Sequence, residues 1–266
     1  TDLPALLILS HGYVSGLEKY RSAGEPIDTE SPKWTALRTA TAFGYDRAKL
    51  KPWDLQSKRF ELINKALEAC KHPSQQRMRF LAQARPVLRL GLGDTQWPIN
   101  EIDLWDYASS IAALFKSGVA RAVLDGGIPT VQAMRWCFLS VRFDGLGYLS
   151  QVHHVTDMLG RRESLDVALN AVKTLLEVTY PLGNEVYRDE NGAVFVVPGW
   201  EETARSTLAL VDDAGTTLEA LIAQTFRDAT REKSARQESL PSFDGELEPV
   251  IAEGNSVRGK DLQLGQ

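Results

Sequence analysis

Two stretches decide the fold of this chain: RWCFLSVRFDG at residues 135–145 and GNEVYRDENGAVFVVP at residues 183–198. The first is rich in strand-forming residues and predicts a strand that ends at Asp144-Gly145. The second predicts a tight hairpin, because Asn191-Gly192 tolerates the positive φ that such a turn needs. Four apolar residues between the two stretches recur at helical spacing and predict a long helix that covers a sheet: Leu165, Leu169, Val172 and Leu176.

The order of elements around these stretches predicts an α+β protein. Helical patterns are expected at about residues 200–213 and 216–233, and a final strand is expected at residues 246–251. The resulting order, β-α-β-β-α-β, is that of the ferredoxin-like fold. Residues 1–124, by contrast, show helical periodicity with almost no strand pattern. The turn-forming residues 125–129 therefore mark the expected boundary between a helical domain (1–126) and a ferredoxin-like domain (127–266) that ends in a polar tail.

Composition is that of an ordinary globular chain. Its 266 residues are 43% hydrophobic and 24% charged, which suffices for a substantial core. No apolar run approaches the length that spans a bilayer, and the first residues lack the basic segment of a secretory signal. Cys70 and Cys137 have no Cys or His at zinc spacing, so both are expected to be reduced, buried thiols of a cytoplasmic protein with no membrane partner. The net charge of −5 argues against nucleic-acid binding by the whole surface but is compatible with a local basic groove.

Three acidic residues stand where a nucleotidyl-transfer site would hold metal ions. Polymerases and nucleotide cyclases place carboxylates at the end of one strand and on the adjacent hairpin, where they bridge two metal ions. Asp144 occupies the first place, and Asp189 and Glu190 lie at the hairpin tip. The tip lacks the two glycines that let a triphosphate approach the backbone. The alternative interpretation is structural, because Asp-Glu-Asn-Gly is a good turn sequence and Asp-Gly ends a strand.

The histidines do not predict a metal site. A metal-dependent phosphohydrolase of the HD type needs a His-Asp dipeptide, and the chain has none. His11 follows an apolar stretch, and His153-His154 have no acidic partner at metal spacing. Structural or surface roles are the favoured interpretation for these histidines.

A basic segment is the third candidate. Residues 71–93 contain no Asp or Glu but hold five cations: Lys71, Arg77, Arg79, Arg85 and Arg89. A locally basic face in an acidic protein suits the docking of phosphates. A solvated helix face, balanced by acids elsewhere, is the open alternative. Arg161 and Arg162 form a lesser basic patch, and P-loop, dinucleotide-binding and Gly-x-Ser-x-Gly motifs are absent from the sequence.

Three segments give the chain a family resemblance: GLGDTQWPINEIDLWDY (91–107), VRFDGLG (141–147) and NEVYRDENGAVFVVP (184–198), with FDGELEP (243–249) adding to them. In their order they resemble the large, polymerase/cyclase-like subunit of type III CRISPR effector complexes, in particular its type III-D-like variants. The first is similar to a helix-opening element of that family, with Tyr107 in place of a His. The other two are similar to the first strand and the hairpin of the family's first palm domain.

The resemblance implies a scaffold rather than an enzyme. In this family the second palm carries a Gly-Gly-Asp-Asp motif and makes cyclic oligoadenylates from ATP, whereas the first palm is degenerate, and this chain resembles the first. Its helical region resembles an HD domain that has lost the His-Asp pair. The chain is therefore expected to serve antiviral defence in a ribonucleoprotein complex. It would contact CRISPR RNA, target RNA and the backbone, handle-gripping and small subunits, with the basic segment as the RNA or partner contact.

Two other functions stay open. The first is a Mg-dependent nucleotide cyclase or polymerase-type palm that makes cyclic oligoadenylates, and only this alternative requires Mg²⁺ and ATP at Asp144 and Glu190. The second is a free-standing interaction module, because this topology hosts many functions.

Overall fold

The structure is a computed structural model that describes residues 2–18, 38–39, 52–89, 99–100, 103–201, 205–235 and 247–258. The chain divides into two compact units, one made of residues 1–13 and 112–266 and the other of residues 14–111. Helices α1 (Leu3–Glu18) and α4 (Leu104–Leu124) contribute residues to both units. The predicted domain division at residue 126 stays a prediction, and α4 ends just before the turn that suggested it.

The described residues of the unit 14–111 are mainly helical, as expected. Helix α2 (Pro52–Lys71) packs against α3 (Pro73–Leu88). Proline at the start of α3 suits that position, because a first-turn N–H has no partner within the helix. A short strand β1 (Arg38–Thr39) pairs in parallel with β2 (Ile99–Asn100).

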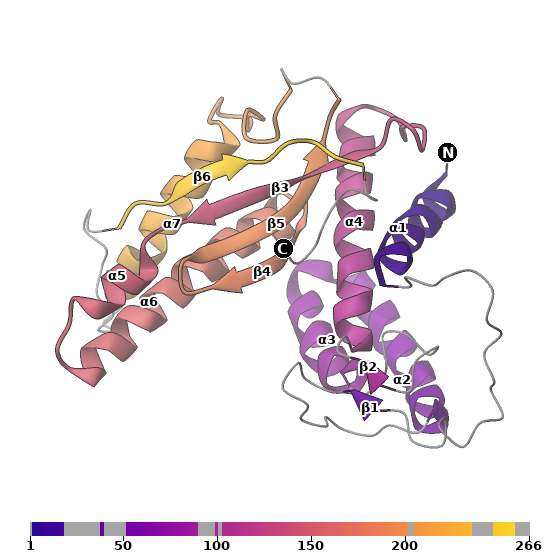
Figure 1. Cartoon of the computed structure of the whole chain (residues 1–266), viewed down its shortest axis with the longest axis horizontal. Coiled ribbons are helices and arrows are strands. Elements are labelled where there is room, and N and C mark those ends of the chain that lie inside the picture. Colours follow the sequence, from indigo (N-terminus) through magenta and orange to yellow (C-terminus); the bar gives the residue numbers. More distant parts are fainter. Residues whose placement is uncertain are drawn as a thin grey trace. The chain divides into compact units, whose positions relative to one another are not determined.

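The other unit contains an antiparallel sheet made of β3 (Arg135–Arg142), β4 (Asn184–Asp189), β5 (Gly192–Gly199) and β6 (Val250–Glu253). The strands lie in the order β4-β5-β3-β6, and all neighbours are antiparallel (Figure 1). Between β3 and β4 come α5 (Gly145–Ser150), α6 (Val155–Thr174) and the π-helical turn η2 (Leu175–Thr179), and between β5 and β6 comes α7 (Leu218–Ala235). This is the ferredoxin-like arrangement, so the predicted α+β fold class is confirmed.

One face of the sheet holds the core beneath α6 and α7. The predicted helical stripe is buried, with 4% or less of each side chain exposed: Leu165, Leu169, Val172 and Leu176. It packs against alternate residues of the two central strands, such as Leu139, Val141 and Phe195. Helix α7 adds Phe226, whose ring centre lies 5.1 Å from that of Phe143.

Trp136 ties the opposite face of the sheet to α4. Its side chain is fully buried, and its indole N–H donates to the carbonyl oxygen of Leu114 at 2.9 Å. The ring of Tyr13 meets it edge-on at 5.6 Å. This contact joins the N-terminal helix, α4 and the sheet within one unit, because buried aromatic side chains contribute strongly to a core.

Two predicted elements differ from the structure. Residues 205–217 form turns and a bridge between Val211 and Thr217 instead of a helix, and residues 202–204 lie outside the described part. The reason is local: Asp212 Oδ1 accepts hydrogen bonds from the backbone N–H of Ala214 and Thr216, which competes with helix formation. Residues 247–249 are not in a strand, and β6 begins at Val250, directly after a proline that lacks the N–H a strand ladder needs; residue 246, where the strand was predicted to begin, lies outside the described part.

The cysteine prediction is half right. Cys137 is buried, whereas Cys70 is exposed, so only one of the two thiols belongs to a core. Burial raises the pKa of the Cys137 thiol far above its ordinary value, with the neighbouring Glu253 carboxylate acting in the same direction. Across the residues that the structure describes, no helix has the length and apolar character needed to cross a membrane.

Candidate functional site

The turn between β4 and β5 carries two of the predicted metal ligands, Asp189 and Glu190. The strands pair up to the residues that flank the turn, Asp189 and Gly192. Gly192 has a φ of 141°, and a Cβ there would lie 2.0 Å from the carbonyl oxygen of Val141. Only glycine meets both conditions, so the turn is fixed by the chain's own packing.

This turn is closed against the start of α5. The backbone oxygen of Asn191 accepts from the N–H of Phe143 at 3.0 Å, and its side-chain oxygen accepts from the N–H of Leu146 at 3.1 Å. A Cβ on Gly145 would lie 1.7 Å from the carbonyl oxygen of Glu190. The β4–β5 turn and the start of α5 are therefore in direct contact.

Asp144 caps α5. Its Oδ1 accepts from the backbone N–H of Gly147 at 2.8 Å, and the carboxylate lies so close beneath Gly147 that a Cβ there would be 2.1 Å from Oδ2. A side chain in this position satisfies a donor that the helix leaves unpaired and stabilises the helix by about 1 kcal/mol. The observed contact of Asp144 is therefore structural, and a structural role is the alternative to a metal ligand that the sequence offers.

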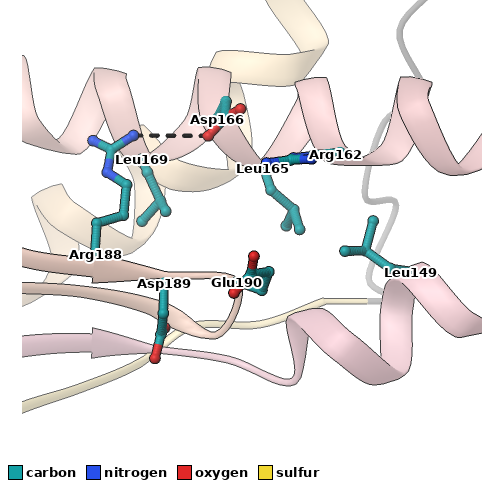
Figure 2. A pocket seen from close by; sticks show the side chains of 8 residues that line it. All are labelled: Leu149, Arg162, Leu165, Asp166, Leu169, Arg188, Asp189 and Glu190. Carbon is teal, nitrogen blue, oxygen red and sulfur yellow. Dashed lines mark ion pairs between the residues drawn. The ribbon is translucent and has the colours of Figure 1, made fainter. Parts of the chain in front are cut away.

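Asp189 points away from α6 (Figure 2). Arg142 Nη1 donates to its two carboxylate oxygens at 3.1 and 3.2 Å, and the hydroxyl of Tyr187 donates to Oδ2 at 3.2 Å. The hydrogen bond to Asp189 and the charge of that carboxylate raise the pKa of Tyr187 above its ordinary value. Both oxygens of Asp189 therefore have partners within the protein.

Glu190 points toward α6, on the other side of the turn (Figure 2). It borders a cavity of about 170 Å³ between α6, α5 and the turn, here called the hairpin-tip cavity. Three leucines and five charged residues line this cavity: Leu149, Leu165 and Leu169, with Arg162, Asp166, Arg188, Asp189 and Glu190. Arg188 is held by Glu185 at 2.6 Å and lies 3.9 Å from Asp166, so its charge is already largely compensated.

The three predicted ligands thus have three different surroundings: a helix cap for Asp144, an ion pair for Asp189 and the cavity rim for Glu190. Within the described part of the chain, no group of three or more His, Cys, Asp or Glu residues is placed to hold a metal ion. This geometry does not fit a two-metal site, which needs carboxylates that converge on both ions. Metal binding by these residues, with Mg²⁺ and ATP, stays a prediction.

The basic segment follows the end of α2 and the length of α3. All of its cations are exposed except Arg77, which is half-buried. Arg77 and Arg85 are separated by about 80° around the helix axis, whereas Arg79 is about 200° from Arg77. The segment therefore presents cations in more than one direction and does not form one strip.

Neighbouring residues partly balance the charge of this segment. Lys71 pairs with Glu68 at 2.6 Å, and Arg89 lies 3.8 Å from the buried carboxylate of Asp103. The guanidinium of Arg85 lies 5.9 Å from the ring centre of Trp105. These contacts leave RNA binding by the segment as a prediction.

Arg161 and Arg162 are adjacent in sequence but differ in environment. The guanidinium of Arg161 lies 4.2 Å from the ring centre of Tyr148 and donates to its carbonyl oxygen at 2.6 Å, so it fastens α6 to α5. Arg162 is exposed and lines the hairpin-tip cavity. The fold therefore brings Arg162 to the same cavity as Asp189 and Glu190, although the sequence alone suggests a basic patch and a separate acidic site.

Three residues of this region were not predicted from the sequence: Arg142, Tyr187 and Arg188. Alternation along β4 carries a usable signal, because it places Tyr187 and Asp189 on one face and Arg188 on the other. The pairing of Asp189 with Arg142 depends on the register of β3 against β5, which no local pattern reports.

No protein-family model matches the chain, and no curated protein matches it. Among solved structures, it is similar to a chain in the crystal structure of a Csm1–Csm4 cassette in complex with cA3. The two chains share 14% sequence identity and superpose with a TM-score of 0.51, over 97% of this chain and 33% of the other. At that identity the similarity shows a shared fold, and this chain spans about a third of the length of the solved one.

Proposed function

We propose that this chain is a scaffold in a type III CRISPR RNA-guided effector complex. It docks CRISPR RNA, target RNA and neighbouring subunits, contributes to antiviral defence and carries out no catalysis itself. The observation that carries the proposal is the shared fold with a chain of the Csm1–Csm4 cassette over 97% of this chain. The three sequence segments point independently to the same class of subunit.

The closed hairpin tip supports the non-catalytic part of the proposal. Catalysis by a palm needs room for a triphosphate and carboxylates that face the metal ions. Here Asn191 uses the backbone N–H groups of Phe143 and Leu146, and Arg142 holds Asp189. These groups are therefore already engaged within the chain.

RNA contact is assigned to the basic segment of α2 and α3. Lys71, Arg79 and Arg85 expose their cations, and such groups suit backbone phosphates, which fix position without reading sequence. Each phosphate contact to single-stranded RNA contributes about 0.7 to the slope of log binding constant against log salt concentration. The double variant Lys71→Gln/Arg79→Gln should therefore lower that slope by about 1.4.

The matched control for this measurement is Lys58→Gln on α2, which removes one exposed cation outside the basic segment. It should leave the slope unchanged. Equal slopes for wild type and the double variant would show that the basic segment does not contact RNA.

The proposal as a whole is tested by purifying the tagged chain from its own host. The expected result is co-purification with several other subunits, at least one of them in multiple copies, and with short RNAs that share a fixed 5′ sequence. A chain that purifies alone, without RNA, contradicts the proposal and favours a free-standing module.

One observation favours the cyclase alternative: the solved neighbour was crystallised with cA3. If this chain makes cyclic oligoadenylates itself, ATP turnover should require Mg²⁺ and disappear in Asp144→Asn. ATP turnover that survives Asp144→Asn would not come from a site that uses Asp144.

A further inference from the structure

The first turns of α6 expose apolar side chains at the edge of the hairpin-tip cavity. Val155, Met158 and Leu159 are 68%, 40% and 55% exposed, and Leu146 of α5 is 56% exposed. An isolated exposed apolar side chain is ordinary on a protein surface, but a cluster of them beside a cavity marks an interaction site. These four residues therefore need a common explanation.

Helical geometry makes the cluster continuous with the cavity. Leu159 lies three residues before Arg162 on α6, and Leu146 lies three residues before Leu149 on α5, so each pair shares one helix face. Arg162 and Leu149 both line the cavity. Helices α5 and α6 are joined by the contact of Arg161 with Tyr148.

We propose that this surface docks an amphipathic helix of a partner protein. The surface, called the α5–α6 groove, consists of the hairpin-tip cavity together with Leu146, Val155, Met158 and Leu159. The partner helix lays an apolar stripe along the groove and carries Lys or Arg beside that stripe. The inference rests on the proposed function only in assigning the partner to the same effector complex.

Charge selects a basic protein segment as the occupant. Of the five charged residues that line the cavity, Asp189 is paired with Arg142 and Arg188 with Glu185. The carboxylates of Asp166 and Glu190 then stand against the guanidinium of Arg162. A surface with this balance repels the phosphates of RNA and attracts Lys and Arg.

Size selects a side chain as the occupant of the cavity. Its volume of about 170 Å³ is below the range of about 300–1,000 Å³ found for small-molecule sites. Its three leucines offer an apolar contact to one side chain of the partner. From Val155 to Asp166, α6 extends for about 17 Å at 1.5 Å per residue, so a partner helix of about three turns would fit along it.

A photo-crosslinking amino acid at position 159 tests this proposal in the full-length chain purified from its host. The matched control places it at Val123 of α4, which is 76% exposed. The expected product at position 159 is a crosslink to another subunit, within a segment that mass spectrometry identifies as an apolar helix flanked by Lys or Arg. A crosslink to RNA or to a second copy of this chain, or the same products at both positions, would overturn the proposal.

A second measurement uses a synthetic peptide of the crosslinked segment. Leu159→Lys should weaken its binding to the purified chain by about tenfold or more, because the substitution removes the burial of one leucine side chain. Val123→Lys should leave binding unchanged, and equal binding by both variants contradicts the groove. If other subunits co-purify but no protein crosslinks at position 159, the groove is wrong and the scaffold function stands. A chain that purifies alone overturns the scaffold function and the assigned partner with it.

Discussion

Gly145→Ala should open the contact between the β4–β5 turn and α5. The added Cβ would lie 1.7 Å from the carbonyl oxygen of Glu190 and 3.0 Å from the ring of Phe143. Both neighbours belong to the packed turn, so the backbone must shift. Overpacking of this kind costs about 1–3 kcal/mol, and a clash with backbone lies at the upper end of that range. Replacing glycine by alanine within a helix would by itself stabilise by about 0.5–1 kcal/mol, so we expect a net destabilisation of about 2 kcal/mol.

Hydrogen exchange measures this effect where it arises. The N–H of Leu146 donates to the side chain of Asn191, and local opening of the turn releases it. A loss of about 2 kcal/mol corresponds to exchange about 30-fold faster, since about 1.4 kcal/mol is tenfold. A local probe is preferable to a single unfolding midpoint, because the chain has two compact units and need not unfold in one step.

Gly127→Ala is the matched control. It is the same substitution at a position where a Cβ meets nothing within 4 Å. Exchange at Leu146 should be unchanged in this variant. If Leu146 exchanges as slowly in Gly145→Ala as in Gly127→Ala, the turn is not closed against α5 by steric contact, and the hairpin tip has room to admit a nucleotide.

Three further predictions concern ionisable groups. Asp189→Asn should lower the pKa of Tyr187 toward its ordinary value, because the substitution removes the negative charge to which the phenol donates. An ultraviolet titration of Tyr187 that is unchanged in this variant would show that Asp189 does not raise its pKa. Burial alone would raise the pKa of Asp125, but hydrogen bonds and charges from its indole and guanidinium partners lower the pKa overall. The ionised Asp125 therefore stabilises the folded protein above the ordinary carboxyl pKa of about 4. This stabilisation is lost as the pH falls through the lower pKa of the folded state. Asp125→Asn should therefore destabilise by about 1 kcal/mol at pH 7 and converge with wild type in acid; urea unfolding that shows the same difference at every pH would contradict this. Maleimide should label Cys70 in the folded protein and Cys137 only after unfolding, and mass spectrometry showing equal labelling would refute the buried thiol.

Local patterns predicted the sheet and its covering helix because those patterns reflect burial directly. Leu165, Leu169 and Val172 recur at helical spacing, and all three are buried against the sheet as that spacing requires. Asn191-Gly192 specified the hairpin because few residues accept its backbone conformation. The helix predicted near residue 210 was wrong because hydrogen bonds to the side chain of Asp212 outweighed a weak helical period.

The candidate site was only partly predictable. The positions of Asp144, Asp189 and Glu190 follow from the element order, but the direction of each side chain depends on strand alternation and on partners distant in sequence. Arg142 meets Asp189 through a register that is set by the whole sheet. The hairpin-tip cavity needs α5, α6 and the turn together, so no single motif indicates it.

ATP turnover by the purified chain in Mg²⁺ tests the central claim most directly, because the claim is that this sheet docks partners and does not catalyse. The account predicts no product above the level given by Asp144→Asn. Cyclic or linear oligoadenylate that forms with wild type and is lost in Asp144→Asn would contradict it.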